Sequence, residues 1–312
     1  MSETNNKIKA VVVGGAGFIG SHLTDALVEK GYDVHVIDNL AAGKKEYVNP
    51  GATLHTLDIR NINDISPIIK GADYLFHLAA LPRIQFSIDY PRESHDTNVN
   101  GMLNVLIAAK DGGVKKVVYS ASSSAYGNQE KLPYTEDMKP SPVSPYGLQK
   151  YIGEEYARIF SNIYGLPTVS LRYFNVYGSR MNIDGGAYML VIGAFLKSMH
   201  DGTPLQITGD GEQTRDFTHV RDVVLANILA AESEAVGAGE VMNIGRGEPV
   251  TINALAKLFP CPTTYIPARI EGRHSKADFA KAKQLLGWEP NVSLSQGVSE
   301  LLAEWKPEPF SA

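Results

Sequence analysis

The stretch of sequence that decides the fold is KAVVVGGAGFIG, at residues 9–20. It begins with a short, largely β-branched apolar run, which predicts a buried strand. Gly14, Gly17 and Gly20 follow this run. Glycines with this spacing let the chain turn tightly, let backbone N–H groups approach a pyrophosphate, and let the next helix pack close to the strand. Because glycines also form ordinary tight turns, the residues around the stretch must decide its meaning.

An acidic residue stands where a dinucleotide site needs one. Asp38 ends the second predicted strand, 18 residues beyond Gly20. A carboxylate there can accept both ribose hydroxyls of an adenosine and repels a 2′-phosphate. The sequence therefore predicts dinucleotide binding and favours NAD over NADP. Lys44 and Lys45 keep NADP open, although a solvated lysine pair in a turn needs no ligand.

Strands and helices alternate through the first half of the chain. A parallel sheet covered by helices on both faces is the usual result of such a pattern. The predicted fold class is α/β, a Rossmann-type doubly wound parallel sheet with a smaller α/β C-terminal substrate domain. The predicted strands are 9–13, 33–37, 53–57, 74–78, 116–120 and 168–173, and the predicted helices are 18–30, 61–70, 95–111 and 145–164.

The alternation loosens after about residue 175, where glycine-rich turns and shorter elements begin. We expect residues 1–175 to form the dinucleotide-binding domain and residues 176–312 the substrate domain, with some later segments returning to the first. No Pro/Ser/Gly-rich linker separates the halves, which predicts direct packing between them. A ligand is expected beyond the carboxyl ends of the strands.

Composition excludes several classes of function. Lys and Arg number 29 against 34 Asp and Glu, a net charge of -5, so no basic excess is present for a nucleic acid or an anionic membrane. The single Cys261 excludes an internal disulfide framework and a multi-cysteine zinc site, and we expect no metal. No segment approaches 18 continuous apolar residues, and the polar lead at 1–7 is unlike a signal peptide. We expect a cytoplasmic protein.

A tyrosine and a lysine, Tyr146 and Lys150, lie four residues apart in a predicted helix and hence on one helix face. The serine-rich loop 120–127 precedes them. A phenol acts as a base near neutrality only if its anion is stabilised. A nearby ammonium and the positive nicotinamide ring of a bound cofactor would do that, and a serine hydroxyl can share the proton of a substrate alcohol. This pattern predicts an acid/base site.

Together these residues resemble the extended short-chain dehydrogenase/reductase superfamily, and within it the NAD-dependent nucleotide-sugar epimerases of the UDP-galactose/UDP-N-acetylglucosamine 4-epimerase type. The likeness covers nearly the whole chain and includes three later motifs, RYFNVYG at 172–178, TRDF at 214–217 and LGWEP at 286–290. It implies that Tyr146 is the acid/base and Ser122 the catalytic serine. Lys150 would bind the nicotinamide ribose and lower the tyrosine pKa.

The resemblance also implies a set of cofactor contacts. Asp58 could accept from the adenine amino group, although a nearby polar residue could simply cap the next helix. The segment after the fourth strand has small residues that would let the backbone approach the cofactor. The expected NAD-binding residues are Gly14, Gly17, Phe18, Ile19, Gly20, Asp38, Asn39, Asp58, Ile59, Leu78, Ala79, Ala80, Asn98, Tyr146, Lys150 and Tyr173.

For the substrate, the resemblance implies two arginines on the diphosphate, Arg215 and either Arg273 or Arg269. Arginine binds phosphate with two parallel hydrogen bonds, yet each could instead make surface ion pairs. The segment 187–191 resembles the uracil-binding helix start, or is plain helix core. Ser87 could also reach the sugar. The expected substrate-binding residues are Arg83, Ser122, Ser123, Asn175, Ala187, Tyr188, Leu190, Val191, Gln206, Arg215, Arg273 and Ser275.

Ser275 bears on the sugar. In the family the corresponding residue lies beside the C2 substituent, where a bulky side chain tends to exclude an N-acetyl group and a small one admits it. The small Ser275 implies acceptance of UDP-GlcNAc/UDP-GalNAc, with UDP-glucose/UDP-galactose as a further pair. Alternatively, Ser275 merely caps a turn before a helix.

The implied reaction is transient oxidation at C4, turning of the 4-keto sugar, and return of the hydride to its other face. Dehydratases of this fold carry an Asp-Glu pair after the catalytic hydroxyl residue, and decarboxylases carry a Glu, where this chain has Ser123 and Ser124. Epimerases at other carbons, uronic-acid 4-epimerases, ketosugar reductases and a non-catalytic dinucleotide sensor stay open. The expected partners are a UDP-sugar and a second copy, forming a homodimer through helices 95–111 and 145–164.

Overall fold

The computed structural model describes residues 7–82, 84–183, 189–268 and 272–305. Its main feature is a seven-stranded sheet with every neighbouring pair parallel, in the order β11-β6-β5-β4-β1-β2-β3. The order reverses beside β1, which makes this a topological switch point. The predicted doubly wound α/β fold is confirmed. The strands are β1 (Lys9–Val13), β2 (Asp33–Ile37), β3 (Thr53–His55), β4 (Tyr74–His77), β5 (Lys116–Ser122), β6 (Thr168–Tyr173) and β11 (Ala238–Ile244).

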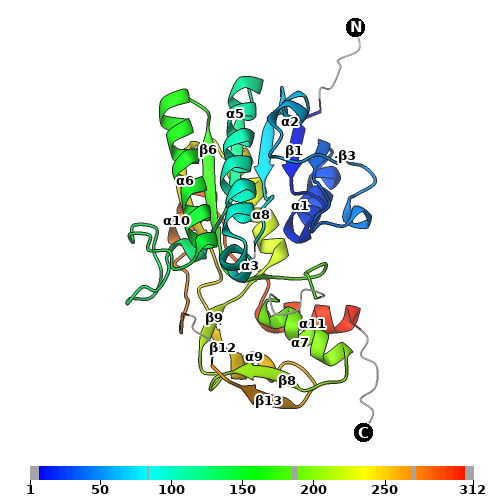
Figure 1. Ribbon diagram of the computed structural model, residues 1–312, viewed down its shortest axis with the longest axis vertical. Helices are drawn as coiled ribbons and strands as arrows, with labels where there is room; N and C mark the ends of the chain where they lie inside the picture. Colours follow the sequence, from blue (N-terminus) through cyan, green and yellow to red (C-terminus); the bar gives the residue numbers. More distant parts are fainter. Residues whose placement is uncertain (1–6, 83, 184–188, 269–271, 306–312) are drawn as a thin grey trace.

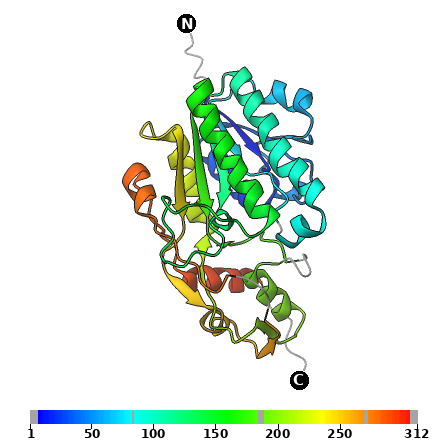
Figure 2. The ribbon, with the colours of Figure 1, turned by 60° about the vertical axis from the view of Figure 1, so that its left-hand side comes forward.

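Helices cover both faces of this sheet (Figures 1 and 2). Successive strand residues point to opposite faces, so Ala10 and Val12 of β1 join one apolar core and Val11 and Val13 join the other. Both faces of the sheet are therefore buried under apolar side chains, as in other parallel sheets. The first core contains α1 (Phe18–Glu29), α8 (Val220–Glu232) and α10 (Ala280–Leu286), and the second contains α2 (Ile62–Ile69), α5 (Met102–Gly112) and α6 (Pro145–Tyr164).

The predicted helix 95–111 is a different structure. It consists of α4 (Pro91–His95), a π-helical segment η2 (Asp96–Gly101) and then α5. A π-helix closes its hydrogen bonds over five residues instead of four. The apolar periodicity that predicts a helix does not reveal this insertion, because the flanking turns keep their apolar face. A short helix α3 (Ile84–Asp89) and two 3₁₀ turns, η1 (Lys45–Tyr47) and η3 (Ser123–Ala125), complete this half.

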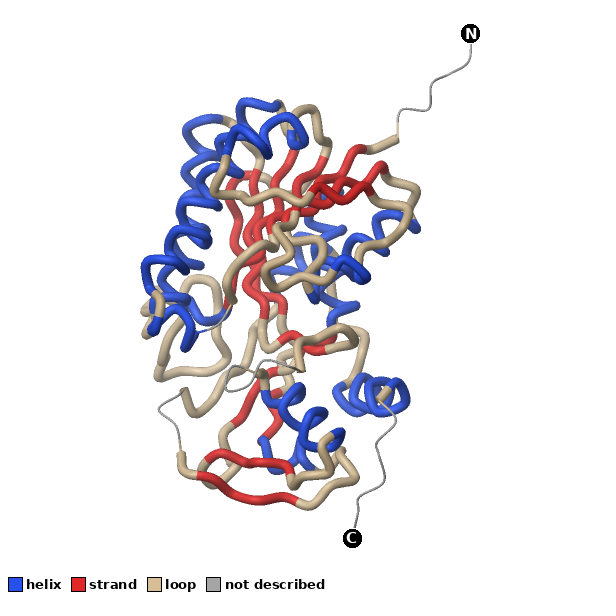
Figure 3. Tube along the Cα trace, turned by 45° about the vertical axis from the view of Figure 1, so that its right-hand side comes forward, coloured by secondary structure: helices blue, strands red, loops and turns tan. Residues whose placement is uncertain are grey.

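The later part of the chain forms a smaller lobe below the carboxyl ends of the strands (Figures 1 and 3). It has its own apolar core, while β11 and α8 return to the large sheet. Within the described ranges no helix is long and apolar enough to cross a membrane. The remaining elements are β7 (Val176–Tyr177), α7 (Val191–His200), β8 (Leu205–Thr208), β9 (Thr214–Asp216), β10 (Thr218–His219), β12 (Pro249–Thr251), α9 (Ile252–Ala256), β13 (Thr263–Ile266) and α11 (Leu294–Glu304).

Candidate active site

The glycine loop lies between β1 and α1, and the chain approaches itself closely there. Gly14 has a φ of +87°, and a Cβ on it would lie 2.5 Å from the backbone nitrogen of Ala79 after β4. A Cβ on Gly20 would lie 2.1 Å from the Gly14 carbonyl oxygen. Only glycine fits both positions. The start of α1, capped by Gly17, is thereby brought beside the end of β4, as a bound pyrophosphate requires.

The Asp38 carboxylate lies against this loop. It accepts hydrogen bonds from the backbone N–H groups of Ala16 at 3.0 Å and Leu40 at 2.8 Å. Burial raises the pKa of Asp38, while these two N–H groups act in the opposite direction. Each carboxylate oxygen has capacity for a second donor, so two ribose hydroxyls can be accommodated. The glycine loop and Asp38 together fit an NAD adenosine and pyrophosphate.

Asp58, expected near the adenine, and Asn39, another expected NAD-binding residue, are in contact. The Asn39 amide donates to Asp58 Oδ2 at 3.1 Å, and Arg60 donates from Nε and Nη2 at 3.0 and 2.7 Å. The Arg60 hydrogen bonds hold the pKa of Asp58 well below its usual range. The alternative of a side-chain cap on α2 is not found, because the N-cap residue Asn61 accepts no hydrogen bond from the helix backbone and its amide donates to the Asp64 side chain instead. Asp58 remains charged and faces an arginine that sequence reasoning did not single out.

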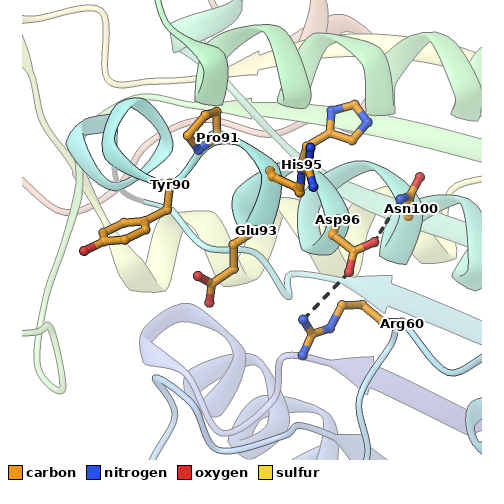
Figure 4. Close-up of a pocket in the computed structure, with 8 residues that line it drawn as sticks. Arg60, Tyr90, Pro91, Glu93, His95, Asp96 and Asn100 are labelled. Carbon is orange, nitrogen blue, oxygen red and sulfur yellow. Dashed lines mark hydrogen bonds and ion pairs between the residues drawn. The ribbon is translucent and has the colours of Figure 1, made fainter.

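A cavity of about 860 Å³ has Arg60, the partner of Asp58, in its wall (Figure 4). Its other lining residues are Tyr90 and residues of α4 and η2, and none of them is a predicted site residue. Arg60 joins it to Asp58, because the same guanidinium lies 3.8 Å from Asp96, which also accepts a hydrogen bond from Asn100. The cavity therefore borders the expected adenine site without including it.

Helix α6, which carries Tyr146 and Lys150, begins with Pro145, and its N-cap Ser144 accepts a hydrogen bond from the Gly147 N–H at 3.1 Å. Burial raises the pKa of Tyr146 to about 12, and a hydrogen bond with Ser122 acts against this rise. Ser122 closes β5, and its Oγ accepts from the N–H and the hydroxyl of Ser124, at 3.2 and 2.8 Å. The structure thus brings two of the three predicted catalytic side chains into contact.

Lys150 lies one turn further along α6 and is buried. Its Nζ donates to the Ser120 carbonyl oxygen at 2.7 Å and lies 4.9 Å from the centre of the Tyr119 ring. Burial lowers the pKa of Lys150 to about 7, and the nearby Glu154 carboxylate opposes this shift. The lysine is aimed at the end of β5, where Ser122 also lies. The three predicted catalytic residues therefore surround one point at the carboxyl end of β5.

Glu154 and Arg172 form a buried ion pair that the sequence analysis did not assign to the site. Arg172 donates to the two carboxylate oxygens at 2.9 and 2.7 Å, and the side chains are only 1 % and 3 % exposed. The guanidinium also lies 4.4 Å from the Tyr126 ring centre. The sequence did contain a sign that Glu154 lies near the site, because Glu154 follows Lys150 by four residues and so lies on the same helix face.

The substrate residues of the second half converge around β9. A bridge between Thr214 and His274 places Arg215 beside Arg273, and Arg215 Nη1 donates to the carbonyl oxygens of Thr214 and Arg273 at 2.9 and 3.3 Å. Arg273 itself makes an exposed ion pair with Asp210 at 2.7 Å. The two arginines are neighbours, and Arg273 also forms the surface ion pair that sequence reasoning had left open.

Asn175 and Ser275 both contact Asp216 of β9. Asn175, with a φ of +29°, donates from its amide to the Asp216 carbonyl oxygen at 3.0 Å. The Ser275 hydroxyl accepts from the Asp216 N–H at 3.4 Å. A left-handed backbone at a non-glycine residue is often found at functional sites. Asp216 is buried, and burial raises the pKa of its carboxyl.

The other predicted residues occupy varied places. Gln206 is exposed on β8, Leu190 precedes α7 and Val191 begins it, and Ser123 begins η3. The Tyr173 hydroxyl donates to Asn227 at 2.9 Å. Arg83, Ala187, Tyr188 and the alternative Arg269 lie outside the described residues.

The possible sugar contact of Ser87 is not supported. Ser87 is fully buried, and its hydroxyl accepts from the Tyr146 N–H at 3.0 Å. It secures the first turn of α6 instead. No three His, Cys, Asp or Glu side chains come together as a metal site in the described part of the chain.

The parallel sheet, the glycine loop with Asp38, and a tyrosine–lysine pair on α6 define a class, the dinucleotide-dependent enzymes. Residues 10–245 match the model of the NAD dependent epimerase/dehydratase family, and the chain belongs to that family.

Similar proteins of known structure have the same fold. A UDP-glucose 4-epimerase from Thermotoga maritima, solved with UDP-glucose, is 41% identical with a TM-score of 0.90, over 95% of this chain and 98% of that one. A UDP-N-acetylglucosamine 4-epimerase from Methanobrevibacter ruminantium, in complex with UDP-N-acetylmuramic acid, is 35% identical with a TM-score of 0.89, over 96% and 99%. By sequence, the chain is also similar to the UDP-glucose 4-epimerase of Mycolicibacterium smegmatis. The two are 32% identical over 94% of this chain and 97% of that one.

These findings confirm the predicted superfamily, the nucleotide-sugar 4-epimerase type of isomerase, and NAD as cofactor. The solved relatives bind UDP-sugars. Two relatives of similar identity carry different sugar names, so family membership leaves the sugar open.

Proposed function

We propose that this protein interconverts UDP-GlcNAc and UDP-GalNAc, and also UDP-glucose and UDP-galactose, by transient oxidation at C4. The observation that carries the proposal is the convergence of Ser122, Tyr146 and Lys150 at the carboxyl end of β5. The absence of a carboxylate at Ser123 and Ser124 supports epimerisation over elimination or decarboxylation.

In the proposed mechanism NAD, held by the glycine loop and Asp38, would supply reversible hydride chemistry at C4. Tyr146 takes the proton of the C4 hydroxyl, and Ser122 shares that proton through its hydrogen bond to the phenol oxygen. With a pKa of about 12, Tyr146 is protonated in the free protein near neutrality. Tyr146 must first lose this proton to act as the base, and the Lys150 ammonium, one turn away on the same helix face, would stabilise the resulting phenolate together with the positive nicotinamide ring of the cofactor.

The nucleotide must be held firmly while the sugar turns. Arg215 and Arg273 are proposed to bind the diphosphate, because both reach the same segment beside β9. Arg273 would exchange its exposed partner Asp210 for a phosphate oxygen, which costs little because exposed ion pairs are weak. Asn175 would contact the diphosphate or sugar, and the ring would meet few polar groups.

Ser275 supports the choice of sugar. Its side chain lies against the Asp216 N–H and fills little of the space beside β9. A small residue there leaves room for the C2 N-acetyl group. A uronic-acid 4-epimerase is the second candidate, and it would need a cation for the C6 carboxylate besides the two arginines assigned to the diphosphate.

The test is incubation of the purified protein, without added cofactor, with UDP-GlcNAc, UDP-glucose or UDP-glucuronate in separate reactions. Chromatography resolves the C4 epimers. Conversion of UDP-GlcNAc and UDP-glucose is expected, from resident NAD. Conversion of UDP-glucuronate alone, or a requirement for stoichiometric reduced cofactor, would replace the proposal with the uronic-acid epimerase or the ketosugar reductase.

We further propose a homodimer through α5 and α6. Helix α6 carries large exposed apolar side chains at both ends, with Leu148 47% exposed in the first turn and Ile163 69% and Tyr164 53% exposed in the last. A second copy of the chain is proposed to cover them. Light scattering should give the mass of two chains, and a monomer at all concentrations would contradict this.

A further inference from the structure

A buried cluster of three polar side chains joins the catalytic helix to α4 and η2. Gln149 lies between Tyr146 and Lys150 on α6 and is 3% exposed, Asn98 is 3% exposed and Ser94 is fully buried. Gln149 Nε2 donates to the Ser94 hydroxyl at 2.9 Å, and Asn98 Nδ2 donates to Gln149 Oε1 at 2.8 Å. Burying an amide is costly unless it is hydrogen-bonded, and both ends of Gln149 are.

The cluster continues to the segment that borders the glycine loop. Asn98 Oδ1 accepts from the Leu81 N–H at 2.8 Å, and its Nδ2 donates to the Leu81 carbonyl oxygen at 3.2 Å. Leu81 lies two residues beyond Ala79. The Ala79 N–H donates to the Val13 carbonyl oxygen of β1 at 2.9 Å, and the Ala79 backbone lies so close to Gly14 that a Cβ on Gly14 would be 2.5 Å from its nitrogen. A continuous chain of contacts thus runs from the glycine loop to the middle of the Tyr146–Lys150 turn.

The π-helical segment η2 makes this chain of contacts possible. Asn98 is its third residue, and the wider turn carries the amide between Leu81 and Gln149. π-Helical turns commonly mark functional positions. This chain of contacts ends at Gln149. The Gln149 side chain is buried against Ser94, so it cannot contact the substrate or the cofactor.

We propose that Gln149 and Asn98 act as a positioning unit that sets the rotation and distance of α6 relative to the cofactor segment 79–81. Tyr146 and Lys150 must meet the sugar and the cofactor at once, and a displacement of about 1 Å can cost about 100-fold in rate. The unit rests on the proposed function, because it acts through Tyr146 and Lys150. It is distinct from Ser144 and Ser87, which hold only the backbone of the first turn of α6.

The test compares Gln149→Leu, which keeps the volume and removes both hydrogen bonds, with Gln149→Glu, which keeps the acceptor for Asn98. Gln296→Leu, at an exposed helical glutamine of the other lobe, is the matched control. For Gln149→Leu we expect kcat for the UDP-sugar to fall about 10- to 100-fold, with KM and bound NAD within twofold of the parent. Gln149→Glu should retain more kcat, and the control should match the parent.

The double variant Gln149→Leu/Asn98→Leu should lose no more kcat than its worse single variant, because residues acting as one unit are not additive. A Gln149→Leu enzyme with parental kcat would overturn the proposal. So would a loss confined to KM, or a loss fully explained by missing NAD.

Hydrogen exchange gives a readout that does not depend on turnover. In Gln149→Leu the amides of 79–82 and of the first two turns of α6 should exchange faster at unchanged global stability. If the parent converts no UDP-sugar, the proposed function fails, and this exchange result decides the positioning unit by itself. Parental exchange rates in both segments would overturn it.

Discussion

Tyr146 and Lys150 are both pushed by burial toward their neutral forms. The phenol pKa rises to about 12, and the ammonium pKa falls to about 7. One neighbour favours the charged form of each group. The hydrogen bond with Ser122 lowers the pKa of Tyr146, and the Glu154 carboxylate raises the pKa of Lys150. As the proposed base, Tyr146 would need a nearby cation and a positively charged cofactor to stabilise its phenolate form.

Tyr146→Phe removes the hydroxyl and leaves the ring. We expect NAD to remain bound, because the glycine loop and Asp38 are untouched, and kcat to fall by about 10²- to 10⁴-fold, the usual contribution of a general acid/base. Steady-state kinetics with cofactor content measured on the same sample checks this. Near-normal turnover would remove Tyr146 from the acid/base role.

Lys150→Met tests whether burying the Lys150 ammonium lowers the stability of the folded protein. The folded pKa of Lys150, about 7, lies below the ordinary lysine value, so the unfolded chain binds the extra proton between these values. Stability therefore rises with pH across this window, and the cost of burying the charge is fully present below about pH 7. Lys150→Met should raise Tm most at pH 6 to 7 and progressively less toward about pH 10.

Thermal unfolding of both proteins at several pH values checks the Lys150 prediction. A difference in Tm that is independent of pH, or that grows with pH, would contradict the buried, destabilised ammonium. Turnover should be lost in Lys150→Met at every pH.

At the scale of elements, α6 is the part of the molecule on which most contacts converge. Its first turn is held by Ser144 and Ser87, its second by Gln149, and its third by the pair between Glu154 and Arg172 of β6. These attachments fix the helix to different elements. A rigid helix is required because the geometry of acid/base catalysis tolerates little displacement.

Glu154→Gln breaks the buried pair by removing one charge. Removing one partner of a buried pair leaves the other uncompensated and costs about 3–5 kcal/mol. Glu155→Gln, the next residue, is the matched control, because its pair with Arg158 is exposed and worth at most about 1 kcal/mol. Urea unfolding of both variants gives the two free energies, and equal losses would refute the distinction.

Helix α6 was predicted within its observed bounds, and η2 was not. Residues 145–164 show a clear apolar face with Pro145 at the first position and Gly165 after the end. Residues 96–101 carry the same kind of apolar pattern, because one inserted residue shifts the face by only part of a turn. The contacts of Asn98 with Leu81 and Gln149 distinguish the two cases, and they depend on other elements.

At the scale of the whole molecule, the proposed substrate site is assembled from distant segments. β9, the segment 273–275 and Asn175 meet below the sheet, and the isolated bridge from Thr214 to His274 holds them together. The proposed catalytic residues come from β5 and α6 of the other half. The proposed function therefore assigns specificity and chemistry to different parts of the chain.

Ser275→Tyr tests whether this position limits the sugar. The larger side chain should reduce kcat/KM for UDP-GlcNAc by at least about 10-fold relative to UDP-glucose, since steric exclusion in a packed site costs about 1–3 kcal/mol. The ratio of the two kcat/KM values, measured on one preparation, is the quantity to compare. Equal loss with both sugars would show that Ser275 does not border the C2 substituent.

By itself the sequence determined the sheet, the glycine loop with Asp38, and the pairing of Tyr146 with Lys150. Each is a local matter, because strand and helix periodicity and turn-forming glycines act over a few residues. Only the tertiary structure decided that Ser87 holds α6, that Arg60 covers Asp58, that Arg172 pairs with Glu154, and that Asn98 reaches Gln149. Most of these contacts join residues far apart in the chain, and no spacing rule relates such residues until the sheet has brought their elements together.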